Sequence, residues 1–432
     1  MKHIFWTSRA VTKMTCITLG ITSLCAIIPL RTAIAQEEQR LQIDDYKITQ
    51  EQPGFYGATY ISKNNSFRSR SAVSTDNGVT WKNSLTKNPP VVADKLVETN
   101  NSRRTPVSSL FDPKTGFFAT FVNSIDSEEV DLSISEPKGA MNTYYLRYKV
   151  SADAGKSWLF DEPIVQEGNF TPQHPVPGVY VGRNAIAMGD RGCIPIITRA
   201  GTILFPTQAS ILGPGTKLQN PGGGPTYTDV IVLRGKWQKD GHILWTGSTR
   251  VQGDPAATTR GIIEPTLAQL KDGRILMVMR GSNGGTLDKE FKLPGYKWFS
   301  YSDDDGVTWS KPAPWKYDDG TSFYSPSSMS ALFHHSSGRV FWVGNITPDN
   351  PKANLPRYPL IFGEVNQENM QLIRATALTV DDVKPGDKDK GRIDISHMSV
   401  TEDPQTHEII LTYPRHYNAY KNTEWVTVRI KP

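Results

Sequence analysis

Short strand-like runs, paired across polar turns, recur along most of the chain. Val107 to Leu110 and Phe117 to Val122 flank one turn, and Met329 to Phe333 and Val340 to Val343 flank another. Three further pairs of apolar runs surround turns at residues 199–201, 271–273 and 403–405. No apolar stripe with helical spacing extends beyond two turns. This pattern predicts an all-β chain built from repeated hairpins.

One eight-residue pattern occurs three times, at residues 74–81, 151–158 and 302–309. Each copy reads Ser-x-Asp-x-Gly-x-Ser/Thr-Trp, which suits a turn whose Asp caps backbone N–H groups and whose Trp covers the loop. Five hairpins and an N-terminal unit with its own copy favour six repeats of about 66 residues between positions 36 and 432. We therefore expect one domain, a six-bladed β-propeller of four-stranded antiparallel blades, with a β-sandwich as the alternative.

The first 35 residues differ in composition from the rest. A basic start and an apolar stretch from Thr15 to Leu30 precede Ala33-Ile34-Ala35, which has the form of a cleavage site. These features predict a signal peptide that is removed after Ala35, and hence a secreted or periplasmic protein. A membrane anchor is the less favoured alternative, because the apolar stretch is short for a span.

The charge balance argues against two classes of partner. The sequence has 48 Lys and Arg against 43 Asp and Glu, a net charge of +5. Four of the basic residues and no acidic residue lie in the predicted signal peptide, so the remainder is close to neutral. Neither nucleic acid nor an anionic membrane is expected as a partner, and a monomer is expected.

Cysteine and histidine usage predicts no disulfide, metal or cofactor. Cys193 is the single cysteine beyond residue 35, and its isoleucine neighbours indicate a buried thiol. The pairs His334-His335 and His407-Glu408 have no further ligands at metal-binding spacing.

Polar residues stand at the starts of several predicted blades. The first strand of each propeller blade lies beside the central axis, so Arg104, Glu264, Tyr324 and His397 are expected to face one another. Charged groups in such positions are costly to bury without a function. One antiparallel hairpin separates Glu264 from Arg280, so pairing returns Arg280 to the Glu264 end of the sheet.

The eight-residue pattern resembles the Asp-box of the sialidase superfamily, and the resemblance covers nearly the whole chain beyond residue 35. Members of that family hold the substrate carboxylate with three arginines. Arg104-Thr105-Pro106 is similar to the family's Arg-Ile-Pro motif, with Arg103 as the alternative in register. The resemblance implies that Arg280 and Arg357 supply the other two arginines, whose guanidinium groups bind carboxylates bidentately.

The resemblance also implies catalytic residues, with one departure from the family. Asp126 follows Arg104 by 22 residues, as the family's acid/base does, although an exposed acidic loop is the alternative there. The family uses a Tyr nucleophile activated by a Glu, here Glu264. Where that Tyr is expected this chain has His397, and Tyr324 is a possible substitute.

Three functions follow from this site. The first is a secreted exo-glycosidase that hydrolyses a terminal acidic sugar, a sialic acid or a related sugar such as a uronic acid, from a glycan. The second is a polysaccharide lyase in which His397 or Tyr324 removes the C5 proton of a uronate. The third is a glycan-binding propeller without turnover.

Overall fold

The computed structural model describes residues 40–61, 67–68, 72–83, 90–97, 99, 101–127 and 140–432. These residues belong to one compact unit, Arg40–Pro432. The predicted signal peptide and its cleavage site lie outside the described residues. Within the described residues, no helix has the length and apolar character needed to cross a membrane.

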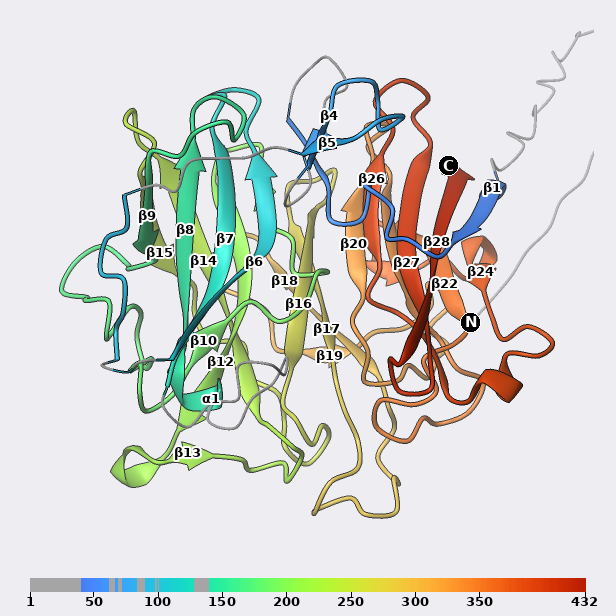
Figure 1. The fold of residues 1–432 in the computed structure, drawn as a ribbon. Helices are drawn as coiled ribbons and strands as arrows, with labels where there is room; N and C mark the ends of the chain where they lie inside the picture. Colours follow the sequence, from blue (N-terminus) through green and yellow to red (C-terminus); the bar gives the residue numbers. More distant parts are fainter. Residues whose placement is uncertain are drawn as a thin grey trace, which may run out of the picture. The chain divides into compact units, whose positions relative to one another are not determined.

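The described strands form six antiparallel sheets (Figure 1), of which the first three lie between residues 59 and 247. The first contains β2 (Thr59–Tyr60), β3 (Phe67–Arg68), β4 (Ala72–Ser74) and β5 (Lys82–Asn83). The second contains β6 (Ser102–Phe111), β7 (Phe118–Asp126), β8 (Tyr144–Ser151) and β9 (Phe160–Pro163). The third contains β10 (Ile186–Ala187), β11 (Ile196–Ile197), β12 (Ile203–Leu212), β13 (Leu218–Gln219), β14 (Thr228–Trp237) and β15 (Ile243–Gly247).

The other three sheets use the C-terminal half and the first strand. The fourth contains β16 (Ile263–Gln269), β17 (Ile275–Arg280), β18 (Lys297–Ser302) and β19 (Ala313–Pro314). The fifth contains β20 (Ala331–His334), β21 (Val340–Asn345), β22 (Leu360–Asn366), β23 (Gln371–Leu372) and β24 (Leu378–Asp381). The sixth contains β25 (Ile393–Ile395), β26 (Ser399–Glu402), β27 (Ile409–Tyr417), β28 (Asn422–Lys431) and β1 (Gln42–Thr49).

Helical structure is minor in the described residues. It consists of α1 (Ala140–Thr143) and three 3₁₀ turns, η1 (Pro214–Thr216), η2 (Arg374–Thr376) and η3 (Lys388–Lys390). The strand β1 pairs antiparallel with β28, so residues near the two ends of the described chain share one sheet. The buried faces of β27 and β28 pack with those of β20, β21, β22 and β24 in one apolar cluster.

The prediction of an all-β propeller is confirmed, but the prediction of six four-stranded blades is wrong. Five sheets are full-sized, with four to six strands each. The sheet β2–β5 is a minor one, because its strands have only two or three residues. Residues 59–83 contain few apolar positions in alternation, so little side-chain burial supports longer strands there.

The three Asp-boxes form the same hydrogen-bonded turn. In the third copy Ser302 Oγ donates to Asp304 Oδ1 over 2.8 Å, and the Thr308 N–H donates to the same oxygen over 2.8 Å. The Gly306 N–H donates to Ser302 Oγ over 2.9 Å, and Gly306 has a φ of 83°. Equivalent bonds surround Asp76 and Asp153. The predicted capping of backbone N–H groups by the Asp is therefore confirmed in all three copies.

The Asp-boxes lie at the opposite end of the sheets from the predicted site. Arg280 pairs with Lys297, the first residue of β18, whereas the third Asp-box begins at Ser302, the last residue of that strand. The Asp-boxes thus form turns at one end of the sheets, and the predicted site residues lie at the other end.

Candidate functional site

Glu264 and Arg280 form an ion pair at one end of the fourth sheet. In the β16–β17 register Ile263 pairs with Arg280, which brings Glu264 beside the arginine as the hairpin predicts. Arg280 Nη1 contacts Glu264 Oε1, and Arg280 Nε donates to Ser327 Oγ over 2.9 Å. The Glu264 N–H donates to the side chain of Gln208, which lies in the neighbouring third sheet, over 3.0 Å. Both ends of the Glu264 residue are thus held in place.

Arg357 reaches the same region from the loop before β22. Its Nη1 donates to the Tyr420 hydroxyl over 2.9 Å, and the side chain is nearly buried. Its Nε is buried and has no hydrogen-bond partner within the described part of the chain. Arg357 therefore has a donor to spare for a ligand.

His397 lies between β25 and β26 and is held by contacts from three segments. Its Nδ1 lies 2.9 Å from Ser396 Oγ, and its Nε2 lies 3.5 Å from Asp190 Oδ2. The Tyr56 hydroxyl donates to its carbonyl oxygen over 2.8 Å. Ser396 is fully buried, so its hydroxyl orients the imidazole and is not accessible to a substrate.

The electrostatics show which predicted residues surround His397. Burial lowers the pKa of His397, and the positive charges of Arg357 and Arg280 lower it further. The carboxylates of Asp190 and Glu264 act in the opposite direction. We call these five residues, Asp190, Glu264, Arg280, Arg357 and His397, the charged centre. The structure thus brings together four of the seven predicted site residues, with a neutral imidazole among them at neutral pH.

Two further titratable residues lie close to the charged centre. Lys297 is fully buried beside Arg280, and burial, with the repulsion from Arg280, lowers its pKa to about 7. Burial lowers the pKa of His416 to about 4, and the nearby His397 contributes to that shift. Both pKa values are lowered because this region excludes water and contains other positively charged groups.

Arg104 and Asp126 form a separate pair. Arg104 Nη1 lies 2.7 Å from Asp126 Oδ1. Within the described residues, no hydrogen bond or ion pair joins either residue to the charged centre. Asp126 also accepts hydrogen bonds from the Leu96 N–H and from the hydroxyls of Ser102 and Tyr145. Burial raises the pKa of Asp126, but these hydrogen bonds and Arg104 outweigh it, so the pKa is lowered.

Tyr324 is half-buried and lies beside another tyrosine. Its ring is nearly parallel to that of Tyr296, with centroids 6.0 Å apart. The Tyr296 carbonyl accepts a hydrogen bond from Gly281, the residue after Arg280. Tyr324 thus lies at the same end of the fold as the charged centre, but no described contact joins its hydroxyl to the centre.

Sequence reasoning missed Asp190 and Tyr420. Asp190 precedes the hairpin around the turn 199–201, whose first run begins at Ile194, so the rule applied to the other blade starts would have found it. Tyr420 comes from the turn between β27 and β28, and its ring lies 4.6 Å from that of His416. A turn residue far from any blade start carried no such signal.

Comparison with known proteins agrees with the fold. Residues 121–375 match the family of BNR repeat-like domains. No match was found among curated proteins.

Three solved structures illustrate the similarity. A protein of unknown function from Dyadobacter fermentans has a TM-score of 0.54 and 14% identity, over 90% of this chain and 99% of that one. Trypanosoma rangeli sialidase has a TM-score of 0.50 and 13% identity, and the match covers 90% of this chain but only 58% of the sialidase. The intramolecular trans-sialidase of Ruminococcus gnavus has a TM-score of 0.50 and 14% identity, over 89% and 94%.

Identities this low show a shared fold alone. The family match, by contrast, covers more than half of the chain and includes the second and third Asp-boxes. The chain therefore has a sialidase-like fold and belongs to the family of BNR repeat-like domains.

Proposed function

We propose that this chain is an exo-glycosidase that removes a terminal acidic sugar, a sialic acid or a uronic acid, from a glycan. The observation that carries the proposal is the charged centre, where two nearly buried arginines, Arg280 and Arg357, surround a neutral histidine. As part of the same proposal, the protein acts as a secreted or periplasmic monomer after cleavage at Ala35.

The arginines would bind the carboxylate of the sugar. The unpartnered Nε of Arg357 would gain the acceptor that it lacks, and an unsatisfied buried donor costs about 1–3 kcal/mol. Arg280 would add charge while its own N–H groups stay bonded to Glu264, Ser327 and Asn354. The Ruminococcus gnavus trans-sialidase was solved with oseltamivir carboxylate, which supports carboxylate binding on this fold.

Arg104 would serve a different purpose from the family's first arginine. Its guanidinium already contacts Asp126 and the backbone carbonyls of Asp94 and Ile125. We therefore propose that the Arg104–Asp126 pair anchors the segment 94–96 against the second sheet, and that the carboxylate is held by two arginines.

His397 would move the proton. Its lowered pKa keeps the imidazole neutral and able to accept a proton at neutral pH, and Asp190 would stabilise the cation that forms. Asp126 is less suited to act as an acid, because its lowered pKa keeps it ionised. The ring of Tyr324 would line the sugar site. Glu264 Oε2, which is buried and unpartnered within the described residues, would accept a hydrogen bond from a sugar hydroxyl.

A polysaccharide lyase is the second candidate, and the His397–Asp190 pair favours it. Removal of the C5 proton of a uronate requires a neutral base near a carboxylate whose charge is neutralised. The charged centre offers both, and this reaction needs no tyrosine nucleophile.

Product chemistry separates the candidates. We expect release of the fluorophore from a 4-methylumbelliferyl sialoside or glucuronide, whereas a lyase would give an unsaturated product that absorbs near 235 nm from uronate polymers. A chain that binds acidic sugars but gives neither product would be a binding protein.

The site assignment is tested by removing one arginine. Arg280→Ala should weaken binding of the acidic sugar by about 2–5 kcal/mol, because a buried charge contact is lost. Arg374→Gln removes an equal charge from an exposed side chain and should leave affinity unchanged. Equal affinity in wild type and Arg280→Ala would refute the charged centre as the binding site.

A further inference from the structure

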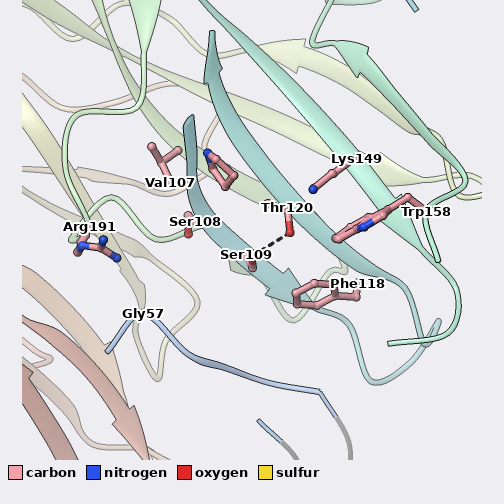
Figure 2. Close-up of a pocket in the computed structure, with 10 residues that line it drawn as sticks. Gly57, Val107, Ser108, Ser109, Phe118, Thr120, Lys149, Trp158 and Arg191 are labelled. Atoms are coloured by element: carbon pink, nitrogen blue, oxygen red, sulfur yellow. Dashed lines mark hydrogen bonds between the residues drawn. The ribbon is translucent and has the colours of Figure 1, made fainter. Parts of the chain in front are cut away.

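Two adjoining cavities lie along β6, apart from the charged centre. The larger has a volume of about 320 Å³, within the range of about 300–1,000 Å³ found for small-molecule sites. The smaller, of about 60 Å³, is shown in Figure 2. Both are lined by Gly57, by Val107 to Ser109 of β6 and by Arg191, so we treat them as one site, the β6 pocket.

The lining of the β6 pocket is positive and rich in hydroxyl groups. Arg191 lines both cavities and Lys149 lines the smaller one. No Asp or Glu lines either cavity in the described part of the chain. In Figure 2 the hydroxyls of Ser109 and Thr120 lie between the two cations and are joined by a hydrogen bond of 3.0 Å. The remaining hydroxyl and aromatic side chains of the lining are Thr59, Tyr60, Ser108, Phe111, Phe118, Trp158, Ser399 and Thr401.

Arg191 is the unusual member of this lining. It is half-buried, and its guanidinium lies 4.4 Å from the centre of the Tyr56 ring. Within the described residues its guanidinium has no carboxylate partner, whereas the fully buried Arg147 and Arg415 each pair with an aspartate. A partly desolvated cation without a counter-ion is costly, and a bound anion offsets that cost.

The backbone at Gly57 holds this arginine close to the chain. A Cβ at position 57 would lie 2.7 Å from Arg191 Nη1, and Gly57 has a φ of 70°. Glycine thus leaves room for the guanidinium between residue 57 and the Tyr56 ring. The Gly57 N–H in turn donates to Ser399 Oγ, another lining residue, over 3.0 Å.

The β6 pocket and the charged centre use adjacent residues. Asp190 points to His397, whereas Arg191, the next residue, lines the pocket. In the same way His397 belongs to the centre and Ser399 to the pocket. The two sites are therefore distinct but share two short backbone segments.

We propose that the β6 pocket is a second ligand site, for a hydroxylated carboxylate of monosaccharide size such as a uronate or a sialate. Arg191 binds the carboxylate, the Ser and Thr side chains bind hydroxyl groups, and the aromatic residues contact the apolar face of the ring. Occupation of this site needs no turnover, so the proposal stands whether or not the charged centre is catalytic.

The test measures binding of glucuronate by calorimetry in the full chain. Arg280→Ala serves as the parent, because it weakens binding in the charged centre. Adding Arg191→Gln to this parent should weaken glucuronate binding at least tenfold, whereas adding Arg374→Gln should have no effect. Glucose, which has the hydroxyls without the carboxylate, should bind at least tenfold more weakly than glucuronate. N-Acetylneuraminate is titrated as a second carboxylate probe.

Three results would overturn the proposal. They are binding of neither acidic sugar by the Arg280→Ala parent, equal affinity with and without Arg191→Gln, and equal affinity for glucose and glucuronate. Circular dichroism and thermal unfolding check that the variants fold. If Arg191→Gln does not fold, Thr401→Val removes a lining hydroxyl without changing charge. Its expected effect is a several-fold loss, and unchanged affinity counts against the pocket.

Discussion

Three residues around the charged centre have backbone angles that side chains rarely adopt. Glu264, His397 and Tyr420 have φ values of 50°, 59° and 71°. Such a conformation costs about 1–3 kcal/mol and persists where surrounding contacts impose it. Here Gln208 holds Glu264, Tyr56 holds His397, and the Tyr420 hydroxyl is held by Arg357. These three are among fourteen non-glycine residues with positive φ in the described part of the chain, and each is held by a contact within or beside the charged centre.

The His397–Asp190 pair predicts a particular pH dependence. His397→Gln should lower kcat/KM at least about 100-fold, since the base is lost.

Asp190→Asn removes the charge that raises the pKa of His397, so that pKa falls further. The acid limb of the kcat/KM profile, measured between about pH 4 and 8, should then move to lower pH. The exposed Asp240→Asn is the control. An unmoved acid limb in Asp190→Asn would separate Asp190 from the reaction.

Because Lys297 is buried, we expect the free energy of unfolding to rise with pH. Burial lowers its pKa in the folded state to about 7, from an ordinary value of 10.5. Between these values the unfolded state binds more protons than the folded state, so the free energy of unfolding increases with pH. The whole destabilisation caused by burying the Lys297 charge is present below about pH 7. Lys297→Met should flatten this dependence in urea unfolding at about pH 7, 8 and 9. The exposed Lys236→Met should retain it. Parallel pH dependences in wild type and Lys297→Met would contradict the assignment.

At the scale of elements, the hairpins were predictable and the minor sheet was not. Apolar runs around the turn Lys271-Asp272-Gly273 form β16 and β17, and Gly273 has a φ of 98°. A short turn fixes the register of an antiparallel pair, which is why Arg280 could be placed beside Glu264 from sequence. The segment 59–83 has no comparable apolar alternation, so its short strands could not be foreseen.

The Asp-box predicts a measurable contribution to stability. Asp304→Ala removes bonds to the Thr308 N–H and to the hydroxyls of Ser302 and Thr308, and should lower the free energy of unfolding by about 1–2 kcal/mol. Asp303→Ala, at an exposed neighbour, should change it by less than about 0.5 kcal/mol.

The pH dependence of Asp304 gives a second check on the same turn. Burial raises its pKa, but the hydrogen bonds lower it to about 2. Its contribution is therefore present above the ordinary value of 3.8 and is lost as pH falls through about 2. Equal losses from Asp304→Ala and Asp303→Ala would show that the turn does not depend on the Asp carboxylate.

At the scale of the whole molecule, buried polar contacts join strands that are far apart in sequence. Asp381 of β24 contacts Arg415 of β27 and accepts hydrogen bonds from Tyr46 of β1 and Tyr413. Arg415 is completely buried and also contacts Asp387. The network links the fifth sheet, the sixth sheet and the first described strand.

Breaking this network should be costly. Asp381→Asn leaves part of the buried Arg415 charge uncompensated, and should lower the free energy of unfolding by about 3–5 kcal/mol in urea. Asp382→Asn changes an exposed neighbour and should be nearly neutral. A loss below about 1 kcal/mol for Asp381→Asn would mean that Asp387 alone compensates the arginine.

The sequence by itself determined the repeated hairpins, the Asp-box turns and the pairing of Glu264 with Arg280, because each depends on residues within one hairpin. Only the tertiary structure decided the contacts of Arg104 and Asp126 with the segment 94–96, the contact of Asp190 with His397 and the place of Tyr420. Those contacts join different sheets or loops, and the path of a loop in space depends on the packing of the whole molecule. Local patterns identified charged residues at blade starts, whereas packing decided which of them meet in the charged centre.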